Sequence, residues 1–175
     1  FDEIKKLVVE DKIGGLLFSM GTTKSHVEWL NKFQSLAKTP LLISMDAEWG
    51  PAQRLSDVFA HPWNMTLGAI QDESLVREIS KRMAEQNKAL GVHINFSPSV
   101  DVNNNSKNPI IGNRSFGEDP INVYRKAKAY IQGHKDVGVY TSIKHFPGHG
   151  DTDKDSHKTL PVISGNMKRL NNVEL

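Results

Sequence analysis

Short apolar runs alternate with longer helix-like stretches along the 175 residues, and this alternation constrains the fold more than any other feature. The apolar runs predict strands at Ile13–Ser19, Leu41–Met45, Val92–Phe96 and Val139–Ile143. The stretches between them predict helices at Ser25–Lys38, Asp72–Leu90 and Ile121–Val137, and a further helix is expected at the start of the chain. Strands that alternate with helices are typical of a parallel sheet with helices packed on it.

The ends and faces of the predicted helices follow from the same pattern. Asp119 is expected to cap a helix whose first residue is Pro120, and Gly91 and Gly138 are expected to terminate two helices. The apolar residues predicted to point inward from the longest helix are Leu75, Ile79, Met83 and Leu90.

The fold class predicted from these elements is α/β. About four parallel strands with flanking helices fit part of a (β/α)8 TIM-like barrel or a small open sheet, and a complete barrel needs about 250 residues. Half a barrel leaves two sheet edges unpaired, which proteins normally avoid. We therefore expect either a fragment of a barrel or self-association of copies through the exposed sheet edges. No repeat, linker or second domain is visible.

Composition excludes several classes of partner. The chain has 22 Lys and Arg against 20 Asp and Glu, and no basic stripe interleaved with aromatic residues, so we expect no nucleic-acid partner. No apolar run approaches the roughly 20 residues that span a bilayer, so we expect no membrane partner. The absence of cysteine excludes disulfides and thiolate metal sites. Localisation stays open between the cytoplasm and the periplasm or exterior.

Polar residues gather where the predicted strands end. Asp46 and Glu48 follow the second strand, Asp101 follows the third, and Lys144 and His145 follow the fourth. In parallel α/β proteins the reactive groups sit at these carboxyl ends, because the connecting loops there are free to vary. The alternative is that each residue merely caps its loop.

The segment from Lys144 to His157 is the richest in His, Asp and Gly, and two metal-binding interpretations fit it poorly. Asp151, Asp153 and Asp155 alternate as in an EF-hand, but Ser and Val stand where that calcium loop needs Gly and Glu. His145 and His149 have the spacing of zinc ligands on a helix, but a proline and a glycine lie between them. We predict no metal site.

Two other interpretations of this segment involve catalysis. Lys144 at a strand end could form a Schiff base, which would require desolvation to lower its pKa. Asp155 and His157 are two positions apart, so the carboxylate could orient the imidazole for general acid/base catalysis. A solvated charged loop is the remaining alternative, although its glycines and proline argue for a shaped backbone.

The loop Gly112–Asp119 contains Arg114 between residues that allow tight turns. A guanidinium there offers a rigid set of donors for a carboxylate or for vicinal hydroxyls. The structural alternative is a salt bridge from Arg114 to Glu118 or Asp119.

Three motifs together resemble glycoside hydrolase family 3, in its bacterial β-N-acetylhexosaminidase (NagZ-like) branch. They are KHFPGHGDTDKDSH at 144–157, ISMDAEWGPAQRL at 43–55 and IGNRSFGED at 111–119. The resemblance covers nearly the whole chain, and the D-S-H element separates this branch from related β-glucosidases. Where the family often has D-Q-E-G-G, this chain has Asp46-Ala47-Glu48-Trp49-Gly50, and Trp49 either packs or offers a stacking face.

The resemblance implies a barrel-type catalytic domain that hydrolyses terminal, non-reducing β-linked N-acetylglucosamine with retention, on substrates derived from peptidoglycan. By the same resemblance, His157 is the general acid/base, oriented by Asp155. The residues implied to bind sugar hydroxyls are Asp46, Arg114, Lys144 and His145. No metal or organic cofactor is implied, because protonation and displacement by a carboxylate suffice.

The family's nucleophile is an aspartate on a later strand, which the family layout places beyond Leu175, and the first barrel strand is expected before Phe1. Asp101, Asp151 and Asp153 do not match the family's motif for the nucleophilic aspartate. We therefore expect residues 1–175 to be the central portion of the catalytic domain and to be inactive alone. The alternatives are a non-catalytic carbohydrate-binding protein and a family 3 glycosidase of other specificity.

Overall fold

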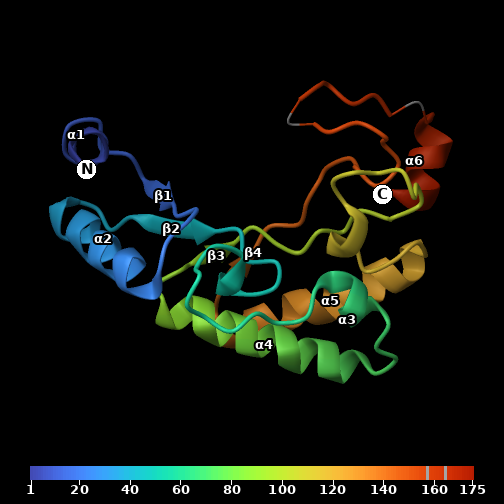
Figure 1. Cartoon of the computed structure of the whole chain (residues 1–175), viewed down its shortest axis with the longest axis horizontal. Coiled ribbons are helices and arrows are strands. Elements are labelled where there is room, and N and C mark those ends of the chain that lie inside the picture. The colour runs from blue at the N-terminus through green and yellow to red at the C-terminus, as the bar shows by residue number, and fades with distance from the viewer. Residues whose placement is uncertain (157, 164) are drawn as a thin grey trace.

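The computed structural model describes residues 1–156, 158–163 and 165–175, and contains one four-stranded parallel sheet with the strand order β1-β2-β3-β4 (Figure 1). The strands are β1 (Gly15–Leu17), β2 (Leu42–Met45), β3 (Ile94–Asn95) and β4 (Tyr140–Thr141). The α-helices are α1 (Asp2–Val9), α2 (Thr23–Leu36), α3 (Asn64–Gly68), α4 (Glu73–Ala89), α5 (Pro120–Val137) and α6 (Met167–Val173). Two 3₁₀ turns are η1 (Pro51–Gln53) and η2 (Gly112–Arg114).

All four predicted strands are present, but each is shorter than the apolar run that predicted it. Regular pairing stops where the backbone turns into the loops that carry the polar residues. Single hydrogen bonds extend the pairing past β3 at both ends, from His93 N to Ile43 O (2.9 Å) and from Phe96 N to Met45 O (2.9 Å). The apolar runs therefore correspond to the whole buried, extended segment of each strand, and the regularly paired residues are only a part of that segment.

The predicted helix ends are confirmed to within two residues, and side-chain caps explain them. Thr22 and Ser25 form a reciprocal capping box, so α2 begins before Ser25. Asp119 accepts hydrogen bonds from the backbone of Ile121 and Asn122 at the start of α5, and Gly138 ends that helix in the left-handed conformation.

One predicted inward residue of α4 is wrong. Met83 is fully buried as predicted, and Ile79 and Leu90 are partly buried and pack against the core. Leu75 is 53% exposed, whereas its neighbour Val76 is fully buried. The buried face of α4 contains Val76, Ser80, Met83, Ala84 and Asn87, so two polar residues that apolar periodicity overlooks share it. The helices α3 and α6 and the two 3₁₀ turns were not predicted, because each is too short to show a period.

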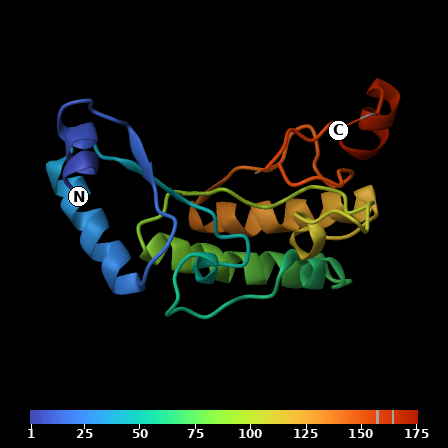
Figure 2. The same ribbon diagram turned by 45° about the horizontal axis from the view of Figure 1, so that its top comes forward.

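Two apolar clusters hold the elements together. One lies between α2 and the sheet and is centred on Phe33, Ile43 and Met45. The other packs α4 and α5 together beneath the loops that follow β3, around Met83 and Tyr130. The two helices lie side by side in both ribbon views, with the two termini at opposite ends of the molecule (Figure 2).

β1 and β4 are the edges of the sheet within the described part of the chain. Self-association through these edges stays a prediction. Among the described residues, no helix combines the length and the apolar character that crossing a bilayer requires.

Candidate active site

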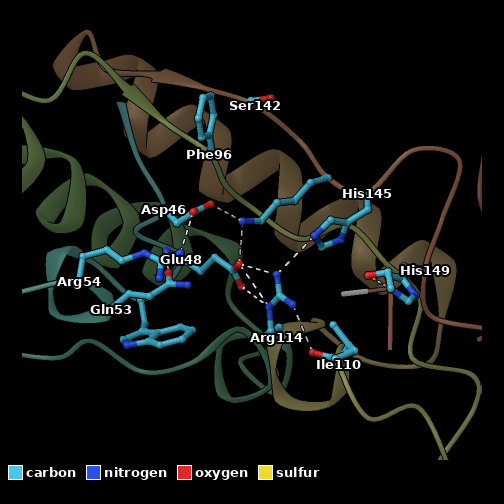
Figure 3. A pocket seen from close by; sticks show the side chains of 13 residues that line it. Asp46, Glu48, Gln53, Arg54, Phe96, Ile110, Arg114, Ser142, His145 and His149 are labelled. Carbon is cyan, nitrogen blue, oxygen red and sulfur yellow. Dashed lines mark hydrogen bonds and ion pairs between the residues drawn. The ribbon is translucent and has the colours of Figure 1, made fainter. Parts of the chain in front are cut away.

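A pocket of about 580 Å³ opens where the strands end, and it gathers side chains from the loops after β2, β3 and β4 (Figure 3). Asp46, Arg114, Lys144 and His145, the residues predicted to bind sugar hydroxyls, all line it. The strand-end rule thus brought Asp46 together with Lys144, which lies 98 positions later in the sequence.

Lys144 and Arg54 hold Asp46 from two sides. Lys144 Nζ lies 2.8 Å from Asp46 Oδ1, and Arg54 Nη2 lies 2.7 Å from Asp46 Oδ2. Lys144 Nζ also lies 2.9 Å from Glu48 Oε1. Two carboxylates stabilise the positive charge of Lys144, whereas a Schiff-base nucleophile must be a neutral amine, so this geometry disfavours the Schiff-base interpretation.

Glu48 is the buried acid at the centre of the pocket wall. Its side chain is 1% exposed and accepts from Arg114 Nη2 at 2.8 Å and from Arg114 Nε at 3.1 Å. The alternative pairing of Arg114 with Glu118 or Asp119 is therefore wrong: Asp119 caps α5 instead. Glu48 is recognisable from the sequence as a strand-end acid, but its partner is not, because nothing local links it to Arg114.

His145 stands between an acid and a guanidinium. Its Nδ1 lies 2.6 Å from Asp101 Oδ2, and its Nε2 lies 3.4 Å from Arg114 Nη2. In Figure 3 the His145 ring and the Arg114 side chain converge near Glu48.

The pocket's acids are anionic because cations and donors outweigh their burial. Burial alone would raise the pKa of Asp46, but Lys144 and Arg54 lower it below its ordinary value. Burial likewise opposes ionisation of Glu48, yet Arg114 and Lys144 lower its pKa. Burial lowers the pKa of Arg114, but the Glu48 carboxylate raises it by more, so the pKa lies above its ordinary value. The site therefore presents fixed carboxylates and fixed cations, which suit a polyhydroxylated ligand.

The backbone beneath Glu48 is held by a buried polar network that sequence analysis missed. Asn95 accepts from Ala47 N and donates to Ala47 O, both at 3.0 Å. Tyr130 Oη donates to Glu48 O at 3.1 Å. The signal available in the sequence was an asparagine inside an apolar run and a tyrosine on the inward face of a helix.

The second half of the predicted site is only partly described. His157 lies outside the described residues. Asp155 is half-buried, and its carbonyl accepts from the backbone N–H of Lys158 and Thr159, both at 3.0 Å. Its neighbour Ser156 lines the pocket and lies 3.0 Å from His149 Nε2.

Within the described residues, no three His, Asp or Glu side chains gather as metal ligands. The rings of His145 and His149 are 6.0 Å apart, and both nitrogens of His149 have hydroxyl partners, Thr152 at 2.6 Å and Ser156 at 3.0 Å.

Trp49 both packs and lines the pocket. Its indole stacks on that of Trp63, with ring centroids 4.1 Å apart and planes 9° apart. The two alternatives that the sequence left open are thus both represented in the structure.

The whole chain, residues 1–175, matches the N-terminal domain of glycosyl hydrolase family 3. The chain belongs to this family. A β-hexosaminidase A of Pseudoalteromonas piscicida is 34% identical over 186 residues, which cover 99% of this chain and 31% of that protein.

Solved structures of family 3 share the fold. A β-N-acetylglucosaminidase of the family from Paenibacillus sp. str. FPU-7 superposes with a TM-score of 0.92 at 38% identity, over 99% of this chain and 35% of that one. NagZ from Neisseria gonorrhoeae, in complex with N-trifluoroacetyl-D-glucosamine, gives 0.88 at 28% identity, over 99% of this chain and 54% of that one. The predicted α/β fold, part of a (β/α)8-type barrel, is confirmed. The chain spans about a third to a half of the length of these proteins.

Proposed function

We propose that the protein hydrolyses terminal, non-reducing β-linked N-acetylglucosamine from glycosides, with retention of configuration. The observation that carries the proposal is the convergence of Asp46, Arg114, Lys144 and His145 on one pocket. Relatives called β-hexosaminidase or β-N-acetylglucosaminidase support the reaction, and the NagZ complex with an N-acylglucosamine supports the sugar.

The proposed sugar-binding roles follow from the chemistry of the four side chains. The Asp46 carboxylate accepts hydrogen bonds from sugar hydroxyls, and the cations Lys144 and Arg114 donate to hydroxyl oxygens. Glu48 keeps both cations in place through its two ion pairs. Because these groups are fixed before the ligand arrives, little conformational entropy is lost when the sugar binds.

The proposed reaction has two displacement steps. His157, oriented by Asp155, protonates the glycosidic oxygen while a carboxylate attacks the anomeric carbon, which releases the aglycone. His157 then takes a proton from water as the water displaces that carboxylate and frees the sugar. The nucleophile is not among the residues of this chain that match the family motifs, so residues 1–175 are proposed to be inactive alone.

Peptidoglycan-derived muropeptides are the proposed natural substrates, on the strength of the resemblance to the NagZ-like branch. The pocket of about 580 Å³, which Trp49 helps to line, has room for a terminal sugar residue and part of the aglycone.

The test compares chromogenic substrates on the whole protein. We expect release of the chromophore from an N-acetyl-β-glucosaminide at least tenfold faster, in kcat/KM, than from the matching β-glucoside. A preference for the glucoside would favour a family 3 glycosidase of other specificity. Sugar binding by calorimetry without turnover of either substrate would favour the non-catalytic alternative. The 175-residue chain, assayed in parallel, is expected to give no turnover.

A further inference from the structure

Asp101 is an acid near the site for which the proposed reaction has no role. It is 1% exposed and does not line the pocket. Its Oδ1 accepts from the backbone N–H of His145 at 3.3 Å and of His149 at 2.6 Å. Its Oδ2 accepts from Ser99 Oγ at 2.8 Å and pairs with His145 Nδ1 at 2.6 Å. Asp101 therefore acts on a ligand through the groups it holds and through the effect of its charge on the nearby Arg114.

The partners of the His145 ring determine where its proton lies. A carboxylate can only accept, so Nδ1 must carry the hydrogen that points to Asp101. Burial alone would raise the pKa of Asp101, but the donors His145 and Ser99 lower it, so the carboxylate is anionic. On the other side, Nε2 lies 3.4 Å from Arg114 Nη2, and a guanidinium can only donate. A lone pair on Nε2 satisfies this contact, whereas a second N–H there would face another N–H.

We propose that Asp101 is a positioning residue that fixes His145 as the tautomer with its proton on Nδ1, so that Nε2 offers the pocket a hydrogen-bond acceptor. For the nature of the ligand this rests on the proposed function: Nε2 has a single lone pair, so a hydroxyl hydrogen of the sugar replaces the long 3.4 Å contact with Arg114 when the sugar binds. The pocket then has a fixed acceptor at His145 beside a fixed donor at Arg114. A sugar whose hydroxyl is replaced by fluorine at that position cannot donate and binds more weakly.

The direct test is the ¹⁵N spectrum of the histidine rings in the whole protein, because nitrogen shifts and two-bond couplings distinguish both neutral tautomers and the imidazolium. Loss of one signal set in His145→Gln assigns the ring. We expect the Nδ1–H tautomer at the pH of the activity assay. A proton on Nε2, either in the Nε2–H tautomer or in the imidazolium, overturns the proposal.

Asp101→Asn gives a sharper test, because the backbone decides how the amide must lie. The two backbone N–H groups at Oδ1 need an oxygen, so the amide NH₂ takes the place of Oδ2 and donates to His145 Nδ1. The ring must then carry its proton on Nε2, facing the Arg114 guanidinium. We expect the spectrum to change to the Nε2–H tautomer and KM to rise about tenfold to a hundredfold with a smaller change in kcat. An unchanged tautomer overturns the proposal.

Two variants separate positioning from general disturbance. Ser99→Ala removes a donor to the same Oδ2 but leaves the contact with His145, so the tautomer is expected to persist. Asp136→Asn, on the surface of α5, controls for loss of a carboxylate elsewhere and should change neither spectrum nor KM. If Asp101→Asn does not fold, the wild-type spectrum alone still decides. If the wild type does not hydrolyse N-acetylglucosaminides, the proposed function fails while the tautomer is still measured.

Discussion

Glu48 and Arg114 form a two-point ion pair across 66 positions of sequence, with the carboxylate buried and Arg114 Nη2 2.8 Å away. The pair joins the loop after β2 to η2, and Lys144 adds the loop after β4 through the same carboxylate. The buried carboxylate of Glu48 thus fixes the positions of Arg114 and Lys144, the two cations of the proposed sugar site, relative to each other.

Removing that acid should cost stability as well as binding. Glu48→Ala leaves Arg114 half-buried without its carboxylate, and breaking such a pair typically costs about 3–5 kcal/mol. We expect a fall of this order in the free energy of unfolding, measured by urea denaturation. Glu85→Ala, which removes an acid from an exposed pair on α4, is the matched control and should leave the denaturation midpoint unchanged. Equal effects of the two variants would contradict the central position given to Glu48.

Arg114→Ala should act mainly on substrate binding. The guanidinium contacts the pocket but is not assigned a proton to transfer, so KM is expected to rise about tenfold or more while kcat changes less. Arg77→Ala removes a surface arginine that pairs with Asp136 far from the pocket, and its kinetics should match the wild type. A fall in kcat with unchanged KM in Arg114→Ala would assign that residue to the chemical step instead.

Gly133 lies where α5 packs closely against α4, and a methyl group there would have no space. A Cβ at this position would lie 2.4 Å from Arg77 O, which is backbone. Gly133→Ala should therefore destabilise the protein by about 1–3 kcal/mol, because the two helices must separate. Gly14→Ala is the control, since nothing lies within 4 Å of the added methyl group. Thermal unfolding of the two variants gives the comparison.

His134 should make stability depend on pH. Burial lowers its pKa from 6.5 to about 4, and a hydrogen bond with the Tyr130 backbone opposes this only in part. Asn95 Nδ2 donates to His134 Nε2 at 2.9 Å, so that nitrogen is an acceptor in the folded chain. The unfolded chain binds this proton below about pH 6.5 and the folded chain only near pH 4, so stability falls as pH decreases through that window. The total loss is roughly 3 kcal/mol.

His134→Gln removes the titrating ring and should flatten this dependence. Urea denaturation of both proteins at intervals from pH 7 to pH 4.5 measures the difference. Parallel curves for the two proteins would show that His134 does not titrate as its surroundings predict. Asp46 and Glu48 also lose part of their contribution as pH falls toward their unfolded pKa values, but they do so in both proteins, so the difference between the two curves reports His134.

Much of the fold and part of the site could be predicted from the sequence, for identifiable reasons. Parallel strands with helical connections bring their carboxyl ends together, so Asp46, Lys144 and His145 could be placed at one edge without coordinates. Caps such as Asp119 and Gly138 are local, and their prediction is confirmed.

Pairings between distant loops could not be predicted. The partner of Arg114 is Glu48 rather than a neighbour in its own loop, because the approach of two loops depends on the packing of α4 and α5 beneath them. Asp101 was recognised as a strand-end acid. Its contact with His145 Nδ1 depends on how the loops after β3 and β4 are placed relative to each other, and spacing in the sequence does not give that placement. The exposed Leu75 shows the related limit on α4, where Ser80 and Asn87 occupy buried positions that apolar periodicity does not assign.

The proposed hydrolysis depends most on His157 as the proton carrier. The direct measurement is kcat and KM of His157→Ala, in the whole protein, for a chromogenic N-acetyl-β-glucosaminide. We predict a fall in kcat of about 10²–10⁴-fold with KM raised little, because general acid/base catalysis contributes about that much. A variant that retains wild-type kcat would contradict the proposed mechanism.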